Sequence, residues 1–332
     1  MHFELGVALR IKGKLDLIRT WVVACSPISE SPFPRLFKAS PWLAAWSAEF
    51  TYSFYDETDE AMAMCEYILS SGFRAALGPE LAWAYKYPSN SASTILRNIY
   101  FEKAVETDKA GSDTEPWVRK LKSSAMSKGE SSDCGEVYKL NDASLLLGMF
   151  LRRYSGADDS DWKPCFRGQI LEAIDMLGDD DNMNDIYAYS QIATVLLAAG
   201  YTKTALEATA VVLQPQEALA SSNAELLRSL QEVGFSTYYF CCGGPCNTPF
   251  HSYKEIPWKE LWACADCIDT AYCEDCIDTA RGKGLPYRKC SPEHKFLKVF
   301  PVMEGREVAA RFEEGKMVVQ KEWLDELRRE WI

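Results

Sequence analysis

The sequence predicts a mainly α-helical protein, in which antiparallel helical hairpins are followed by a small cysteine-rich module with short β-hairpins and by a terminal helix. Two observations lead to this fold class. Apolar residues recur every three or four positions over most of the chain, which is typical of amphipathic helices. Eight of the twelve Cys lie between Cys241 and Cys290. A helical core does not require so many closely spaced cysteines, so their density indicates a separate module.

The composition limits the possible classes of protein. The chain has 332 residues, of which 47% are hydrophobic, enough for a buried core and more than one domain. Its formal net charge of −12 repels phosphate backbones and anionic membrane surfaces, so we expect neither a nucleic acid nor a membrane as a partner. No stretch reaches the roughly 18 apolar residues of a membrane span, and the N-terminus lacks a signal-peptide cleavage site. We therefore expect an intracellular protein, cytoplasmic or nuclear.

Residues 1–110 are expected to be helical. One helix face carries an aromatic stripe at i, i+4, i+8 and i+12, formed by Trp42, Trp46, Phe50 and Phe54. A further helix is expected to begin at Thr58 and to end near Gly72, with apolar positions Ala61, Met64, Cys65 and Ile68. Stripes of this kind are core packing, and we assign them no chemistry.

Residues 111–138 change in character, because Ser, Lys, Gly and acidic residues dominate them. This composition predicts a flexible linker or loop between two helical regions.

Helical periodicity returns over residues 139–235. The first stripe consists of Phe166, Ile170, Ile174 and Leu177. A helix over 185–199 is expected to break at Gly200, and a second helix then runs toward Pro215, while Ser222 and Glu225 form a capping box for another helix. The stretch from 189 to 215 resembles one tetratricopeptide-type unit. The residues themselves predict helical hairpins that stack as in an α-solenoid.

Residues 301–332 are expected to form a strand and a helix at the end of the chain. Trp323, Leu327 and Trp331 recur at i, i+4 and i+8, with charged residues opposite, so they predict one apolar helix face. That face either packs on the protein's own domain, the reading we favour, or docks on another chain.

Residues 236–300 contain four pairs of metal-ligating residues at short spacing. The pairs are Cys242-x3-Cys246, Cys264-x2-Cys267, Cys273-x2-Cys276 and Cys290-x3-His294. Close pairs favour metal over disulfides where nothing indicates secretion, and a tetrahedral zinc site takes four such thiolate or imidazole ligands. Eight ligands therefore predict two structural Zn²⁺ ions. The turn at 243–245 is expected to present backbone N–H groups to thiolate sulfurs.

Two pairings of these ligands remain open. The five residues between Cys267 and Cys273 are long enough for a strand that separates the two pairs, which favours an interleaved arrangement. The first and third pairs would then share one ion, and the second and fourth pairs the other. In the sequential alternative, the first pair joins the second and the third joins the fourth. Cys241 and His251 are competing ligands. We favour Cys242 over Cys241, and His251 is expected to be a surface or hydrogen-bonded residue.

The order of these pairs, followed by the apolar segment at 295–300, resembles a ZZ-type zinc finger. ZZ modules are cross-braced, so the resemblance supports the interleaved pairing. Where ZZ modules generally end in two His, this chain has Cys290 and His294. Helical repeats followed by such a module are similar to a group of fungal tetratricopeptide-like proteins with variant ZZ-type ends.

The motifs of common enzyme classes are absent from the sequence. No nucleotide-binding glycine loop, H-E-x-x-H or G-x-S-x-G occurs, and fully ligated zinc sites leave no position for substrate. We therefore expect an interaction or scaffold protein rather than an enzyme. The alternative is a RING-type cofactor of ubiquitin ligation, although this chain lacks the lone His and the Cys cluster that RING domains have in the middle of their motif.

Acidic residues surround the ligand pairs. They suggest that the module binds a protein or peptide partner, and the resemblance to ZZ modules implies that it recognises the N-terminus or a basic tail of that partner. The alternatives are a general protein–protein contact and a solvated acidic face without a binding role. The expected contact residues are Asp266, Asp269 and Asp275. Ala271 stands where the resemblance implies a second Asp.

Overall fold

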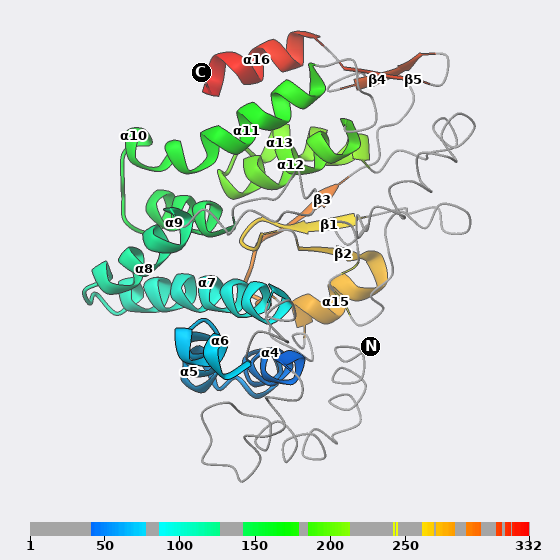
Figure 1. The fold of residues 1–332 in the computed structure, drawn as a ribbon. Helices are drawn as coiled ribbons and strands as arrows, with labels where there is room; N and C mark the ends of the chain where they lie inside the picture. The colour runs from blue at the N-terminus through cyan, green and yellow to red at the C-terminus, as the bar shows by residue number, and fades with distance from the viewer. Residues whose placement is uncertain are drawn as a thin grey trace. The chain divides into compact units, whose positions relative to one another are not determined.

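The computed structural model describes residues 41–77, 86–126, 142–178, 185–212, 242, 244, 261–268, 270–282, 290–299, 310–313, 316–319 and 321–331. This part of the chain is mostly helical, with a small antiparallel sheet near its C-terminal end and a terminal helix (Figure 1). The expected mainly α-helical class is confirmed at this level. The chain divides into two compact units: residues 1–124 with 285–289, and residues 125–284 with 290–332.

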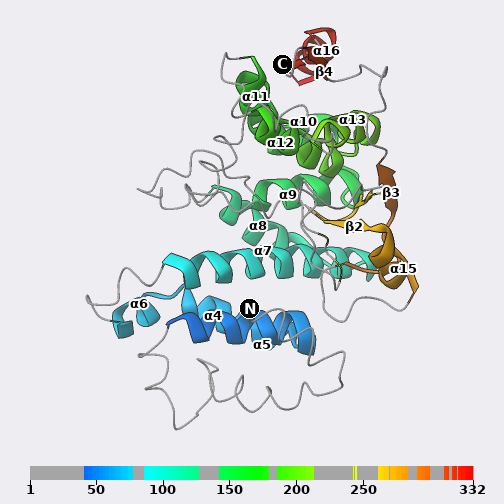
Figure 2. The same ribbon diagram turned by 90° about the vertical axis from the view of Figure 1, so that its right-hand side faces the viewer.

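The first unit is a group of helices. In chain order they are α4 (Pro41–Phe50), the π-helical turn η1 (Thr51–Tyr55), α5 (Thr58–Ile68), α6 (Ser71–Leu77), α7 (Lys86–Lys109) and α8 (Glu115–Met126). The long helix α7 packs against α4 and α5, as Figures 1 and 2 show. The predicted aromatic stripe lies in the core of this unit. Phe50 stacks on Phe54 with 4.7 Å between ring centroids, and only Trp42, at the start of the stripe, is 44% exposed.

Helix α5 buries the four apolar residues that its periodicity predicts, Ala61, Met64, Cys65 and Ile68. Burial raises the pKa of the Cys65 thiol to about 12, so this cysteine behaves as a small apolar residue. The expected end of the helix was wrong. Helix α5 ends at Ile68, and Gly72 lies inside α6.

The prediction of a linker over 111–138 was wrong for residues 115–126, which form helix α8. Asp113 Oδ1 accepts the backbone N–H of Glu115 at 3.0 Å, which satisfies a free donor of the first turn. Val118 and Leu121, three residues apart, are buried. The polar composition hid a short amphipathic stripe, because only one narrow face of α8 needs to be apolar. Residues 127–141 lie outside the described part.

The second unit contains the helices α9 (Asp142–Arg153), α10 (Asp159–Trp162), α11 (Pro164–Leu177), α12 (Asp185–Ala198), α13 (Thr202–Val212) and α16 (Lys321–Trp331). Helix α12 packs on α11 and on α13 (Figure 2). The predicted break at Gly200 is present, with φ of +77°. A side chain there would also collide with the guanidinium of Arg152. The capping box at 222–225 lies outside the described residues.

Side chains connect neighbouring helices of this unit. Ser144 Oγ donates to the Cys165 carbonyl at 2.7 Å, joining α9 to α11, and Gln191 Nε2 donates to the Gln169 carbonyl at 3.0 Å, joining α12 to α11. The predicted stripe on α11 is buried, and it consists of Phe166, Ile170, Ile174 and Leu177.

The terminal helix α16 packs on its own unit, which was the favoured interpretation of its apolar face. Trp323, Leu327 and Trp331 are all buried. The indole of Trp331 lies 5.3 Å from the ring of Tyr201 and 6.5 Å from that of Trp162. The helix begins at Lys321, directly after a strand over residues 316–319. This strand, β5 (Lys316–Val319), pairs antiparallel with β4 (Ala310–Glu313).

The cysteine-rich module contains the three-stranded sheet. Its strands are β1 (Leu261–Cys264), β2 (Ala271–Cys273) and β3 (Phe296–Val299), in the order β2-β1-β3 with both neighbours antiparallel. Helix α15 (Glu274–Gly282) follows β2 directly. Leu261, Tyr272 and Ile277 are buried. No helix in the described part of the chain is both long enough and apolar enough to cross a membrane.

Candidate metal centres

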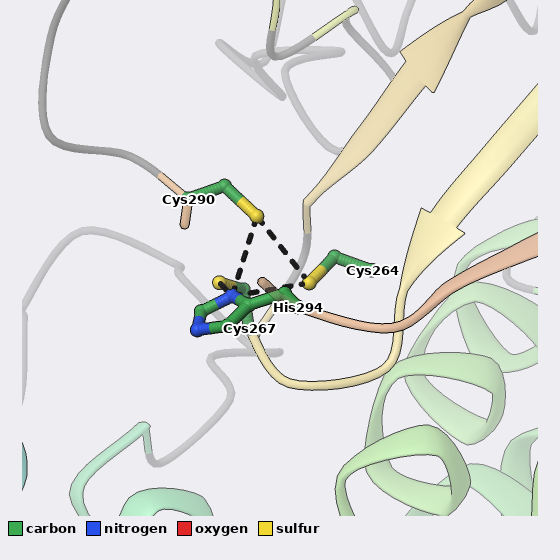
Figure 3. Close-up of side chains that lie close together, drawn as sticks. All are labelled: Cys264, Cys267, Cys290 and His294. Carbon is green, nitrogen blue, oxygen red and sulfur yellow. Dashed lines mark hydrogen bonds between the residues drawn. The ribbon is translucent and has the colours of Figure 1, made fainter. Parts of the chain in front are cut away.

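The first cluster consists of Cys264, Cys267, Cys290 and His294 (Figure 3). Strand pairing assembles it. Cys264 is the last residue of β1 and lies opposite Phe296 of β3, so the residues that precede β3 come close to the turn that follows β1. That turn carries Cys267, and a second turn before β3 carries Cys290 and His294.

The donor atoms of this cluster lie within a few tenths of an ångström of the edge lengths of a tetrahedral metal site. His294 Nδ1 is 3.2 Å from Cys267 Sγ, 3.4 Å from Cys290 Sγ and 3.6 Å from Cys264 Sγ. The sulfurs of Cys264 and Cys290 are 3.5 Å apart. Metal–sulfur bonds of about 2.3 Å and metal–nitrogen bonds of about 2.1 Å give tetrahedral edges of about 3.6–3.8 Å. The four residues therefore fit one four-coordinate ion.

The crowding of these groups changes their acidity. Hydrogen bonds with the thiols of Cys264 and Cys267 lower the pKa of Cys290 to about 4. The hydrogen bond with Cys264 raises the pKa of Cys267. A hydrogen bond with Cys264 also raises the pKa of His294. The lowered pKa of Cys290 favours its thiolate, which is the form of Cys that binds metal.

The second cluster consists of Cys242, Cys273 and Cys276, all buried. Cys242 forms a parallel bridge with Ala271 of β2, and its sulfur is 3.6 Å from that of Cys273. Cys276 lies in the first turn of α15, where the helix dipole favours a thiolate. These three residues could share an ion. The predicted fourth ligand, Cys246, lies outside the described residues, as do Cys241 and His251.

Backbone N–H groups point at the sulfur of Cys242. Gly244 N and Cys273 N both donate to it at 3.3 Å, as the sequence predicts for the turn at 243–245. Asp266 N likewise donates to Cys264 Sγ at 3.4 Å. Such bonds stabilise thiolates and orient them toward a metal.

The ligand pairs are grouped in the interleaved order. The second pair, Cys264 and Cys267, lies with Cys290 and His294, whereas the third pair, Cys273 and Cys276, lies with Cys242. The sequential alternative does not fit this geometry, because it would place Cys273 and Cys276 with Cys290 and His294, whereas they lie with Cys242.

The three acids predicted to contact a peptide differ in position. Asp275 is exposed on α15, and Asp269 lies outside the described residues. Asp266 is engaged within the protein, because Arg153 Nη1 lies 2.7 Å from its Oδ1 and Lys295 N donates to its Oδ2 at 2.7 Å. Sequence reasoning missed Arg153, and no local pattern could have indicated it, since it stands 113 positions from Asp266.

Comparison of the chain with known protein families, with curated proteins and with solved structures returned no match. The fold and the two clusters therefore define the class: a mostly helical protein with Cys and His clusters that could hold metal ions.

Proposed function

We propose that this chain is a zinc-binding interaction protein without catalytic activity, acting inside the cell. In this proposal, helical hairpins of tetratricopeptide-like type and a ZZ-like module with two structural zinc ions present surfaces to protein or peptide partners. The observation that carries the proposal is the first cluster, in which three thiols and one imidazole converge on a single point.

The chemistry of that cluster favours zinc. Thiolate ligands select zinc over magnesium or calcium, which prefer oxygen. Four protein ligands complete the tetrahedral shell, so no position is left for an activated water, and the ion has a structural role. For the second cluster, Cys246 is the proposed fourth ligand, joining Cys242, Cys273 and Cys276.

A structural role also fits the size of the module. Its strands have three or four residues each, so its own apolar core is small. A structural zinc ion contributes about 10–16 kcal/mol to folding in small domains. A module held in this way is a rigid support for loops and side chains that bind a partner.

The partner proposed for the module is a protein segment with a free N-terminus or a basic tail. Exposed acids remain on α15, where Glu274, Asp275 and Asp278 are all accessible. Asp266 does not support amine binding, since both of its oxygens have partners inside the protein. Peptide recognition would therefore depend on Asp275 and Asp269.

Metal content tests the zinc proposal directly. Native mass spectrometry of the purified chain, with elemental analysis of the same sample, should give about two zinc ions per chain, one for each cluster. A single ion would contradict the two-site arrangement. A chain that binds no metal, even when it is refolded with zinc under reducing conditions, would overturn the proposal.

Peptide titration tests the partner. Isothermal titration calorimetry with basic peptides should show binding by a free N-terminus and weaker binding after acetylation. Asp275→Asn should weaken binding, whereas Glu293→Gln, which removes an exposed acid elsewhere in the module, should leave it unchanged. Equal affinity for free and acetylated peptides would exclude recognition of the amine.

A further inference from the structure

Arg153 connects the helical part of the second unit to the first cluster. It is the last residue of α9, a helix that buries Met149 and Phe150 in the core. Its side chain is only 18% exposed. The guanidinium contacts the turn between Cys264 and Cys267 twice, with Nη1 at 2.7 Å from Asp266 Oδ1 and Nη2 at 2.5 Å from the Ala265 carbonyl oxygen.

Asp266 extends this contact to both turns that carry the ligands. Its own N–H donates to Cys264 Sγ at 3.4 Å, and its second carboxylate oxygen accepts the N–H of Lys295 at 2.7 Å. Lys295 follows His294 directly in the chain. A further bond, from Ala265 N to the Lys295 carbonyl at 2.8 Å, closes the same junction. Asp266 therefore contacts both ligand turns, Cys264 through its backbone N–H and the residue after His294 through its carboxylate.

The guanidinium is well suited to hold that carboxylate in place. Arg presents its donors in a planar fork of fixed geometry, and here one branch takes the carboxylate and the other the adjacent carbonyl. Both side chains of the ion pair are largely withdrawn from water, at 18% and 32% exposure. Removal of the cation would leave a partly buried carboxylate without its strongest partner, so the two turns would lose their common anchor.

We propose that Arg153 is a positioning residue for the first cluster and couples its metal occupancy to the packing of α9. This inference rests on the proposed metal site. Groups that orient metal ligands typically change metal affinity about 10–100-fold when removed. Because coupling between two events is reciprocal, metal binding should in turn stabilise the end of α9.

The sequence offers a matched control in the neighbouring Arg152. Its guanidinium lies 5.5 Å from the Trp162 ring centroid and against Gly200, where it serves helix packing. The two arginines leave the same turn of α9, and only Arg153 contacts the cluster turns in the described part of the chain. Arg152→Met therefore removes an arginine from the same turn without touching Asp266.

The experiment uses the full chain carrying Cys273→Ser, which disables the second cluster and leaves one site. Co²⁺ serves as a visible probe of thiolate coordination, and Zn²⁺ affinity follows from its displacement of Co²⁺. We expect Arg153→Met to weaken metal binding about 10–100-fold, Arg153→Lys to weaken it less, and Arg152→Met to leave it unchanged. Circular dichroism checks that each variant keeps its helices.

A double-mutant cycle with Asp266→Asn keeps the proposal testable if single variants are unstable. The loss in the double variant should be close to that in either single variant, because both act through one contact. Equal metal affinity in the parent and Arg153→Met, or an equal loss in Arg152→Met, would overturn the proposal. If the parent chain with both clusters intact binds no Co²⁺ or Zn²⁺, the proposed metal site fails instead.

Discussion

Gly244 and Cys276 are so close that only glycine fits at the first position. A Cβ atom on Gly244 would lie 2.3 Å from the Cβ of Cys276, 2.5 Å from its Sγ and 3.2 Å from the Sγ of Cys242. The backbone at Gly244 can therefore approach the second cluster and donate to Cys242 at 3.3 Å. The absence of a side chain at this residue is part of the geometry of the cluster.

We expect Gly244→Ala to disrupt the second cluster alone. The added methyl would push the backbone at Gly244 away from the thiols, so native mass spectrometry should show one zinc ion per chain instead of two. Gly282→Ala, in the same module with nothing within 4 Å of the added atom, is the control and should keep both ions. Full metal content in Gly244→Ala would show that the backbone at this position can move without loss of the site.

Thiol reactivity should reveal which residues share an ion. In Cys273→Ser, the expected loss of one ion frees the thiols of its cluster, because metal-bound thiolates react slowly with alkylating agents. Mass mapping after brief alkylation should then show modified Cys242 and Cys276, with Cys264, Cys267 and Cys290 still protected. Modification of Cys264 and Cys267 instead would contradict the interleaved grouping.

Adding a methyl group at two glycines of the second unit should change the free energy of unfolding in opposite directions. In Gly148→Ala, on α9, the new atom would lie 2.5 Å from Phe166 Cζ, in a packed core. We expect a loss of about 1–3 kcal/mol in the free energy of unfolding. In Gly168→Ala, on the exposed side of α11 with nothing within 4 Å, we expect a gain of about 0.5–1 kcal/mol from helix propensity. Denaturant titration measures both, and equal effects would refute the packing of α9 on α11.

The anchoring of α16 should depend on acid pH through Glu330. Its carboxylate accepts hydrogen bonds from Tyr201 Oη at 2.8 Å and Lys163 Nζ at 3.0 Å, and these bonds lower the pKa of Glu330. A lowered pKa in the folded state means that the stabilisation is complete above the unfolded pKa, about 4.3, and is lost as the pH falls below it. The effect is modest, because the group is exposed.

Melting followed by tryptophan fluorescence tests this expectation, since Trp331 neighbours Glu330. Glu330→Gln should lower the melting temperature at pH 7, and the difference from the parent should shrink below about pH 4. Glu326→Gln, at an exposed position of the same helix, should show no such difference. A difference that grows toward acid pH would mean that the carboxylate does not anchor α16.

The sequence by itself determined the local features of this protein. Helical periodicity predicted α5, α11, α12 and α13, and the close spacing of Cys residues predicted the ligand pairs, because both depend on residues within a few positions of one another. Short-range composition also misled: the polar residues around Val118 and Leu121 hid helix α8, whose narrow apolar face gains its stability from packing on the rest of its unit.

Only the tertiary structure decided how these parts combine. The grouping of Cys264 with His294 follows from the register of β1 and β3, and the place of Arg153 follows from where α9 ends relative to that sheet. Contacts between residues 113 positions apart leave no periodic or local trace in the sequence. They arise when the hydrophobic burial of each element fixes its orientation, and single residues such as Gly244 and Asp266 acquire their roles from that packing.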